Sequence, residues 1–373
     1  MLLFVLVLAA AGAVDGGFPS ATSPSSLNEQ ARFIAGLANA QDSVLAKLEV
    51  SAGWQKHAAA LDAGWSKLES KRLEPMAKWA AQEVVPALDA KLPLIYLFGG
   101  PDAISVDVIY ADAPVYVLAG LERVGSMPPI ESLTPEEVTR GLESLRAAMR
   151  TTIDSSFFIT SQVSADLKRS KLQGVLPIML LMLARHGDEV LEAEPIFLDP
   201  TGAVNVGAVT PKNGVSGLRI RFLRNGLGLP RQLFYFSQDV SNDALPSRPG
   251  LLPFVKSLGP FNSFFKAASF ILHDRHFSKV REAVLEGSQS ILQDDSGVAF
   301  QHLSPSKWQL TFFGEYTPQT GPFSDHYQTE LKAAWDAAPK RPLPFRTGYK
   351  HERGSTMILA LKKASVDAGT AAP

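Results

Sequence analysis

The sequence contains no cysteine, has almost no net charge, and has no hydrophobic run beyond its first residues that is long enough to cross a membrane. The absence of cysteine excludes disulfide bonds, thiolate metal sites and cysteine nucleophiles. Lys and Arg total 36 and Asp and Glu total 37, so the chain lacks the basic excess with which proteins bind nucleic acid. Because 46% of the 373 residues are hydrophobic, we expect a globular protein with a substantial core.

Several motifs of well-defined chemistry are also missing. The sequence has no Gly-x-Ser-x-Gly nucleophile elbow, no Walker A loop, no EF-hand loop and no Gly-x-Gly-x-x-Gly dinucleotide fingerprint. Function must therefore be inferred from weaker local patterns.

Residues 1–13, MLLFVLVLAAAGA, contain an apolar run that ends in the small-residue triplet Ala11-Gly12-Ala13. This pattern is typical of a secretory signal peptide, and the Gly-, Pro- and Ser-rich residues 14–25 are typical of a linker. No Lys or Arg precedes the run, so a buried N-terminal helix and an uncleaved anchor stay open as alternatives. We predict a cleaved signal, a periplasmic or secreted bacterial protein, and a mature chain without a transmembrane span.

Helical periodicity dominates residues 26–90, which begin with a capping box formed by Ser26 and Glu29. Short apolar runs at 92–98 and 115–121 are typical of buried strands, and strands and helices alternate from there to residue 364. We therefore predict an α/β or α+β fold, with a mixed β-sheet flanked by helices and an N-terminal helical layer. A division of this unit into two pseudo-repeated halves, 91–210 and 211–364, stays open as a possibility. Residues 365–373 are predicted to form a disordered tail.

Further elements are predicted in the second half of the chain. The turn Asn225-Gly226-Leu227-Gly228 between two apolar runs indicates a hairpin. We expect helices at 251–258, 264–273, 278–292 and 326–337, and strands at 298–303, 308–313, 345–349 and 357–361.

Two glycines follow the first predicted strand, in the segment Phe98-Gly99-Gly100-Pro101-Asp102, and Glu122 follows the second strand. Glycines at a strand end let the backbone approach a ligand, and open α/β sheets bind ligands at the carboxyl ends of their strands. A strand, a glycine-rich turn and an acid after the next strand resemble the layout of nucleotide- and methyl-donor-binding sheets, although an exported protein rarely meets those cofactors. We predict a ligand site at Gly99, Gly100, Asp102 and Glu122; the alternative is a plain turn that Asp102 caps.

Asp294 and Asp295 stand together in the turn Asp294-Asp295-Ser296-Gly297. Paired carboxylates can bind a divalent cation or exchange protons with a substrate. His273 and His276 are spaced so that two imidazoles can share a helix face and bind zinc. We name Asp294, Asp295 and His273 as candidate catalytic residues and leave the metal open; ordinary turn chemistry and a histidine at a helix end are the alternatives.

The chain resembles an uncharacterised family of bacterial exported proteins over about Leu92–Leu361. The shared features are a strand followed by a Gly-Pro-Asp turn, a GLE-x-x-GS segment and an LQDDSG segment. The resemblance implies one integrated unit rather than independent modules. It transfers no catalytic roles, because the family has no assigned activity. The segments that carry it are IYLFGGPD, VYVLAGLERVGS, LFYFSQDVSN, FKAASFILH, ILQDDSGV and WQLTFFGEY.

Three functions remain open on the sequence alone. The first is an exported protein that binds a small ligand or an envelope component in an acidic pocket at Gly100–Asp102 and Glu122. The second is a metal-assisted hydrolase that uses Asp294 and Asp295, and the third is a degenerate nucleotide- or methyl-donor-type domain. Convergence of these acids and a histidine around one pocket favours the enzyme. Parallel strands on both sides of the strand before Gly99 favour the third function. The cofactor and the oligomeric state are left unassigned.

Overall fold

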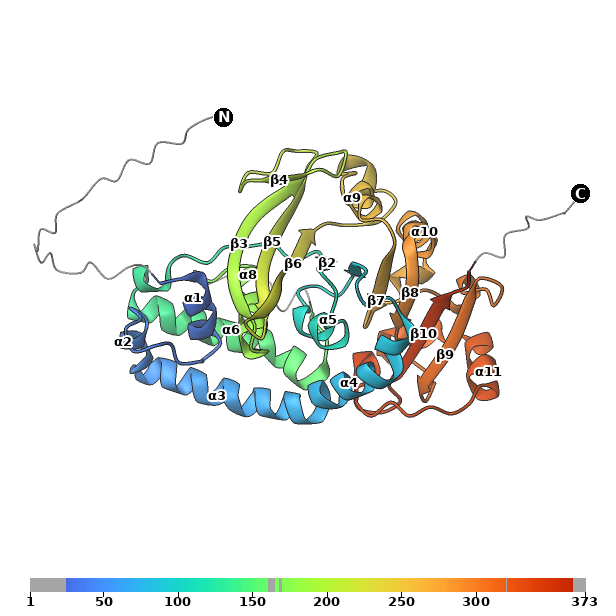
Figure 1. Ribbon diagram of the computed structural model, residues 1–373, viewed down its shortest axis with the longest axis horizontal. Helices are drawn as coiled ribbons and strands as arrows, with labels where there is room; N and C mark the ends of the chain where they lie inside the picture. Colours follow the sequence, from blue (N-terminus) through green and yellow to red (C-terminus); the bar gives the residue numbers. More distant parts are fainter. Residues whose placement is uncertain (1–24, 160–164, 168–169, 320, 365–373) are drawn as a thin grey trace, which may run out of the picture.

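The computed structural model describes residues 25–159, 165–167, 170–319 and 321–364 (Figure 1). The predicted signal peptide (1–13), almost all of the predicted linker (14–25) and the predicted tail (365–373) lie outside these residues. The described chain has the predicted α/β architecture, a mixed sheet with helices on its faces. No helix within the described ranges combines the length and the apolar character needed to cross a membrane.

All ten described strands belong to one sheet, in the spatial order β4-β3-β5-β6-β2-β1-β7-β8-β10-β9. The five middle strands, from β6 to β8, run parallel. The three strands on one side and the two on the other pair antiparallel. The bounds are β1 Leu94–Leu97, β2 Val115–Gly120, β3 Glu189–Leu198, β4 Val204–Val206, β5 Val215–Arg224, β6 Leu227–Ser237, β7 Phe261–Phe265, β8 Ser288–Gln293, β9 Trp308–Gly314 and β10 Thr356–Lys362.

The parallel strands are wound in two directions from the centre of the sheet. From β1 the chain passes through α5 (Ala103–Ile109) to β2 on one side, and from β7 it passes through α10 (Ser278–Gly287) to β8 on the other. Crossovers of one hand that progress in opposite directions place their helices on opposite faces of a sheet. The helices α5 and α10 accordingly pack into different cores. β1 and β7 are thus neighbours at a topological switch point.

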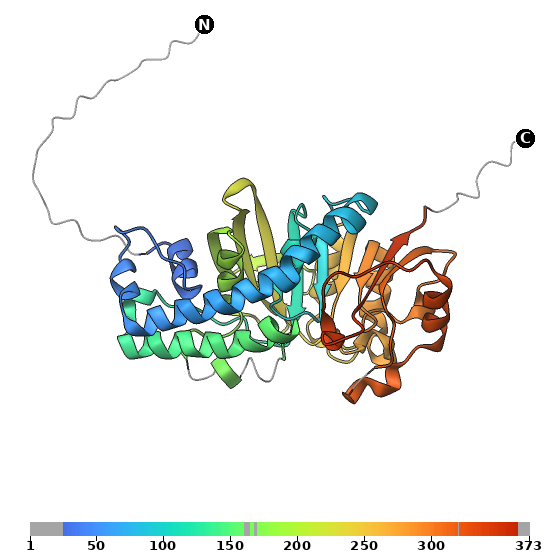
Figure 2. The same cartoon turned by 90° about the horizontal axis from the view of Figure 1, so that it is seen from below.

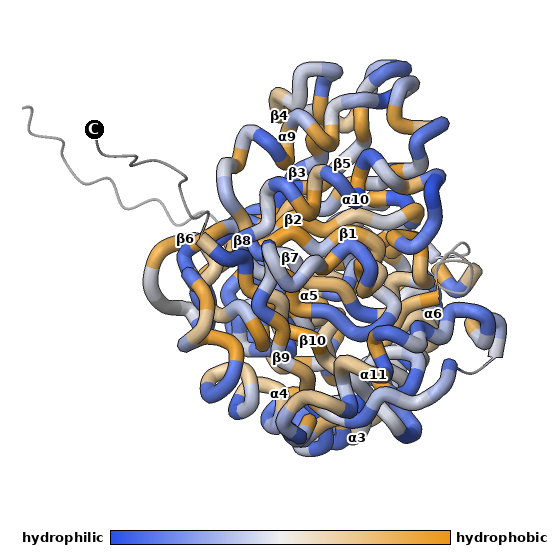
Figure 3. The backbone as a smooth tube through the Cα atoms, turned by 90° about the vertical axis from the view of Figure 1, so that its right-hand side faces the viewer, coloured by the Kyte–Doolittle hydropathy of each residue, from blue (hydrophilic) through white to orange (hydrophobic). Residues whose placement is uncertain are grey.

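Side chains alternate across β1 and build two cores. Leu94 and Tyr96 enter the larger core, and Ile95 and Leu97 enter the second. The larger core lies under the N-terminal helices, α5, α6 (Pro135–Ser155) and α8 (Leu176–Arg185), whereas α9 (Leu251–Ser257) and α10 cover the second. Hydrophobic residues concentrate along β1, β2 and α5 in the interior (Figure 3). A smaller cluster lies between β9, β10 and α11 (Thr329–Ala337).

The N-terminal residues form the predicted helical layer. α1 (Leu27–Ile34) begins at the Ser26–Glu29 capping box, and α2 (Ala46–Glu49) leads into α3 (Ala52–Leu68). A π-helical turn joins α3 to α4 (Glu74–Trp79), and this long helical rod lies beside α6 (Figure 2). Trp54, Trp65 and Trp79 are buried, so their rings pack into the core.

The main errors of element prediction fall in the second half of the sheet. Residues 264–273, predicted as one helix, form the end of β7, a loop and a single 3-10 turn at Ile271–His273. Residues 278–292 divide into α10 and β8. A strand buried on both faces has no apolar period that distinguishes it from a buried helix. The predicted strands at 298–303 and 345–349 are irregular segments with residues in short 3-10 helices, whereas the hairpin at Asn225-Gly226 is confirmed. The sheet continues across residue 210, where a boundary between halves was left open.

Candidate functional site

The carboxyl ends of the five parallel strands lie along one edge of the sheet, and most of the predicted site residues follow them. Open α/β sheets bind their ligands at this edge, next to the switch point. The loops after β6 and β7, which the sequence analysis left out of the site, reach the same edge. In chain order, the strands β1, β2, β6, β7 and β8 are followed closely by Gly99-Gly100, Glu122, Gln238-Asp239, Lys266-Ala267 and Asp294-Asp295.

A pocket of about 330 Å³ opens at this edge, and Gly99, Gly100 and Glu122 line it. Its walls come from the ends of β1, β2 and β6 and from the loop after β7, so the pocket spans both sides of the switch point. The volume lies at the lower end of the range for small-molecule sites. The rings of Phe98 and Phe277 stand in the wall and leave the cavity open.

The glycine turn after β1 approaches its own strand and the turn after β2. A Cβ atom on Gly99 would overlap the ring of Tyr96, and one on Gly100, where φ is +59°, would lie 3.2 Å from Oε1 of Glu122. A Cβ atom on Gly120 would overlap Oε2 of the same carboxylate. The missing side chains of these three glycines therefore make room for Tyr96 and Glu122. The glycine turn and the Glu122 carboxylate consequently lie side by side in the pocket.

Glu122 is 3% exposed, and β6 fixes its orientation. The Tyr235 hydroxyl donates hydrogen bonds to the backbone oxygen of Glu122 and to its Oε2, each over 3.0 Å. Burial, followed by the Glu122 carboxylate, raises the pKa of Tyr235 well above its usual value, so Tyr235 remains a donor.

Asp102 does not line the pocket; it caps α5 and forms a buried ion pair. Its Oδ1 accepts a hydrogen bond from the Ser105 amide over 3.3 Å, and its Oδ2 lies 2.6 Å from Nζ of Lys266. The Tyr96 hydroxyl donates to the same Oδ2 over 3.2 Å. Burial lowers the pKa of Lys266, and the Asp102 carboxylate opposes this shift. The capping role that the sequence left as an alternative for Asp102 is therefore the one the structure shows.

Lys266 is the central residue of this network, and the sequence analysis does not single it out. Its ammonium also donates to the hydroxyls of Ser105 over 2.9 Å and Ser156 over 3.3 Å, and Ser156 in turn is bonded to Thr347 over 2.9 Å. The network joins β7 to α5, to the end of α6 and to the segment before β10. The available signal was a single lysine inside the apolar run 261–272, because such a lysine needs an anionic partner when buried.

Backbone strain is concentrated around the pocket. Six non-glycine residues of the described chain have φ between +50° and +76°. Three of them line the pocket, and two more, Ser156 and Phe270, lie within two residues of a lining residue. A left-handed conformation costs an L residue about 1–2 kcal/mol and persists where the surrounding contacts impose it, commonly at functional sites. The strain therefore marks this edge independently of the cavity. The five residues are Phe98, Ser156, Ala267, Ser269 and Phe270.

Asp294 and Asp295 are buried and hold different segments of the protein. Oδ2 of Asp294 accepts a hydrogen bond from the Ala267 amide, and Oδ1 accepts one from the Ser296 amide, each over 2.9 Å. Burial, followed by the neighbouring Asp295, raises the pKa of Asp294 to about 6. Asp295 pairs with Lys350 over 2.6 Å. Asp294 thus fastens the strained loop after β7, and neither aspartate lines the edge pocket.

His273 lies beyond the strained loop and lines a separate hollow of about 420 Å³ with His326. Burial, followed by the charges of His326 and His302, lowers the pKa of His273 to about 4, so its ring is neutral at pH 7. Within the ranges that the structure describes, His273, Asp294 and Asp295 belong to no group of three side chains close enough to share a metal ion. The structure therefore does not gather the predicted catalytic residues around one metal.

Comparisons of the chain with known protein families, with curated proteins and with solved structures found no match. The resemblance to a family of bacterial exported proteins stays a prediction. Function must consequently be inferred from the chemistry of the edge pocket.

Proposed function

We propose that the protein binds a small organic ligand in the edge pocket, and that this ligand is a ribonucleoside without a phosphate at the glycine turn, such as the adenosyl part of a methyl donor. The observation that carries the proposal is the position of the Glu122 carboxylate. It follows β2, lies against the bare glycine turn after β1 and lines a cavity of about 330 Å³ beside the switch point.

The strand order supports a nucleoside. When the parallel strands are numbered along the chain, β6-β2-β1-β7-β8 has the order 3-2-1-4-5 of a doubly wound nucleotide-binding sheet. In such sheets an acid about 20 residues after the glycine turn accepts hydrogen bonds from the ribose hydroxyls. Glu122 follows Gly100 at about this spacing. Its carboxylate oxygens are hydrogen-bond acceptors, the kind of group that ribose hydroxyls need as a partner.

The turn after β1 argues against a bound phosphate. Phosphates bind where the first amides of a helix are bare, whereas the Asp102 carboxylate caps the first turn of α5. Pro101 has no amide hydrogen to donate. A free nucleoside, or the positively charged sulfonium of a methyl donor, needs no such amides. This turn therefore favours the methyl-donor class over dinucleotides.

The remaining walls of the pocket suit a base. Phe98, Val240 and Phe277 give an apolar surface against which a purine can pack. Gln238 and Asp239, after the end of β6, offer amide and carboxylate groups that can bond the exocyclic groups of the base. The flat apolar base and the hydroxyl-rich ribose of a nucleoside would thus each contact a wall of matching chemistry.

The other functions raised by the sequence fit this edge less well. A metal-assisted hydrolase needs Asp294 and Asp295 to face a substrate, whereas they bond the loop after β7 and Lys350. An envelope component would occupy the same pocket, and competition with adenosine separates the two cases. Export to the periplasm or medium stays a proposal; N-terminal sequencing of the mature protein from its native host tests for cleavage after Ala13.

Calorimetric titration with adenosine, S-adenosylhomocysteine, ATP and NAD tests the ligand class. We expect the first two to bind and the two phosphate-bearing ligands to bind at least about tenfold more weakly. A hydrogen bond to a charged group contributes about 1.5–3 kcal/mol. Replacing adenosine by 2′,3′-dideoxyadenosine, or Glu122 by Gln, should therefore each weaken binding by about 10- to 100-fold. The two changes together should cost little more than either alone, because they remove the same bonds.

Glu282→Gln is the matched control, because Glu282 is exposed on α10 and outside the pocket. This variant should bind adenosine like the wild type. A chain that binds none of the nucleosides, or a Glu122→Gln variant that distinguishes adenosine from its dideoxy analogue as well as the wild type does, contradicts the proposal.

A further inference from the structure

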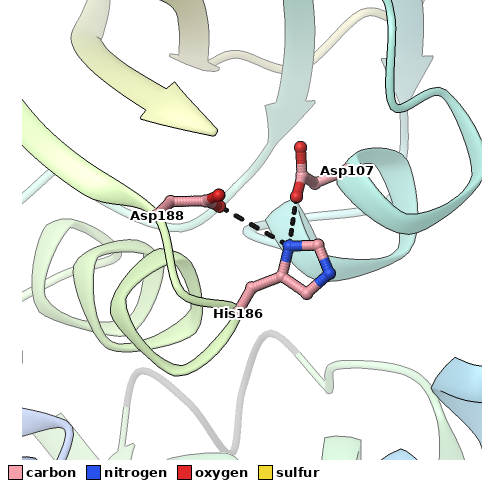
Figure 4. A group of neighbouring side chains, drawn as sticks. All are labelled: Asp107, His186 and Asp188. Carbon is pink, nitrogen blue, oxygen red and sulfur yellow. Dashed lines mark ion pairs between the residues drawn. The ribbon is translucent and has the colours of Figure 1, made fainter. Parts of the chain in front are cut away.

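A second group of buried titratable side chains lies at the opposite edge of the sheet. Asp107 lies in the last turn of α5, His186 caps the C-terminus of α8, and Asp188 directly precedes β3 (Figure 4). One ligand atom of each lies within 4.8 Å of the other two. Asp107 contacts Tyr116 at the start of β2, whereas Glu122 follows its end, so roughly 20 Å of strand separates this group from the pocket.

Each aspartate is anchored through one oxygen and presents the other to His186. Oδ1 of Asp107 lies 3.4 Å from Nε of Arg224, and Oδ1 of Asp188 accepts a hydrogen bond from the Asn225 amide over 3.1 Å. Both Oδ2 atoms face Nδ1 of His186, that of Asp188 at 3.6 Å. Among the described residues, the three facing atoms form ion pairs with one another (Figure 4), and none of them makes a hydrogen bond to any other group. Outer partners that fix one oxygen and leave the other pointing inward are typical of metal ligands.

The surroundings favour a cation at the point that these atoms share. The side chain of Asp107 is 2% exposed and that of Asp188 is fully buried, so both carboxylates are withdrawn from water. The side chain of His186 is 19% exposed, which leaves a route from solvent. The C-terminal, negative ends of α5 and α8 lie at the group. Arg224 contacts the outer oxygen of Asp107, whereas the inner oxygen pairs with His186.

We propose that Asp107, His186 and Asp188 bind one divalent transition-metal ion of the zinc class. One imidazole nitrogen, two carboxylate oxygens and a water satisfy a four-coordinate zinc ion. Mg²⁺ and Ca²⁺ prefer oxygen ligands alone, so a site with an imidazole selects against them. The ion fastens α5 and α8 to the start of β3, and thereby joins the antiparallel extension to the parallel sheet. This inference is independent of the proposed ligand in the edge pocket.

Titration of the metal-free, full-length chain with ZnCl₂ tests the site, and CoCl₂ supplies a visible absorption signal from the bound ion. We expect one ion per chain and a Tm that rises with zinc concentration. Loss of an outer partner alone weakens metal binding by about 10- to 100-fold, so His186→Ala should weaken it by more than about 100-fold. His276→Ala is the matched control, because the exposed His276 also pairs with an aspartate, Asp274, but belongs to no three-residue group within the described ranges.

Asp188→Asn is the second variant, since it keeps the size of the side chain, and circular dichroism establishes that each variant folds. Zinc binding that His186→Ala and Asp188→Asn leave unchanged overturns the proposal. If neither variant folds, the wild-type titration decides. A wild-type chain that does not bind one zinc ion overturns the proposal, and the three side chains are then an ion triad of a protonated histidine and two aspartates. Nucleoside binding is not a readout here, so failure of one proposal leaves the other standing.

Discussion

The two edges of the parallel sheet differ in how their connections are built. At the carboxyl edge, five of the six left-handed non-glycine residues of the described chain line a pocket or lie within two residues of a lining residue. At the amino edge the sixth, Asn225, lies in a two-residue hairpin turn, where Asn-Gly is a favoured sequence. The same strands therefore end in strained loops on one side and in relaxed turns on the other. Because sterics alone do not require this asymmetry, it points to the carboxyl edge as the functional one.

Buried charge differs between the edges as well. The Asp102–Lys266 pair lies behind the pocket wall and is bonded to β1, to α5 and to the end of α6. The Asp107–His186–Asp188 group instead joins two helix ends to a strand. The first network holds strained loops in place, whereas the second fastens regular elements. Variants that remove buried charge or backbone strain at the carboxyl edge test whether the first network holds strained loops in place.

The largest effect is expected from Lys266→Met, which leaves the Asp102 carboxylate buried without its partner. Breaking a buried ion pair by removing one partner costs about 3–5 kcal/mol, so the free energy of unfolding measured in urea should fall by about that amount. The double variant Lys266→Met/Asp102→Asn removes the unpaired charge and should recover part of the loss. Lys332→Met, at the exposed pair with Asp336, is the control and should change the free energy of unfolding little, because solvent screens an exposed pair. Equal losses in the two single variants contradict the prediction.

The next effect is a dependence of stability on pH at Asp294. Burial raises its folded-state pKa to about 6, above the value of 3.8 for an unfolded chain. The folded state therefore holds this proton more tightly, and the resulting stabilisation is complete below about pH 4 and is lost as the pH rises through about 6. Relative to Asp294→Asn, the wild type should lose on the order of 2–3 kcal/mol between pH 4 and pH 7.

Urea unfolding of both chains at several pH values measures this difference. Asp274→Asn is the control, because hydrogen bonds from the His276 amide and ring lower the pKa of the exposed Asp274. Its contribution runs in the opposite direction, since stability is lost as the pH falls. If the difference between wild type and Asp294→Asn does not change from pH 4 to pH 7, Asp294 is not the buried acid that fastens the loop after β7.

The sequence predicts the first half of the sheet better than the second. Glycines stand at or directly after the ends of the runs 92–98 and 115–121, so the approximate ends of β1 and β2, and the positions of Gly99 and Glu122 after them, follow from the chain alone. The end of β7 and nearly all of β8 fall in predicted helices, because strands buried on both faces have no distinguishing period. The switch point between β1 and β7 could not be recognised without β7. The nucleotide-type strand order therefore emerges only from the structure.

The residues of the candidate site were likewise predicted only in part. Gly100 and Glu122 meet in the pocket, as two strand ends in parallel neighbours should. Lys266 and the left-handed loop after it were missed, since Ala, Ser and Phe carry no sequence signal for a positive φ. The group of Asp107, His186 and Asp188 was missed because α5 and α8 are brought together only by tertiary packing.

The smallest expected effect has the most direct bearing on the comparison between the two edges. Ala267 has φ of +52° and lines the pocket. Glycine adopts this conformation without the cost of about 1–2 kcal/mol that alanine bears, but it adds about 0.5–1 kcal/mol of unfolded-state entropy. Ala267→Gly should therefore raise the free energy of unfolding in urea by up to about 1 kcal/mol, and it should weaken adenosine binding, because the relaxed loop no longer holds the pocket wall.

The same substitution at Ala60, exposed in the middle of α3, should lower stability by about 1 kcal/mol. Opposite signs at the two positions identify strain as the property that distinguishes the loop after β7 from a regular helix. If Ala267→Gly instead destabilises the protein as much as Ala60→Gly does, the left-handed backbone at this edge carries no strain. Backbone strain would then no longer be evidence, independent of the cavity, that the carboxyl edge is the functional one.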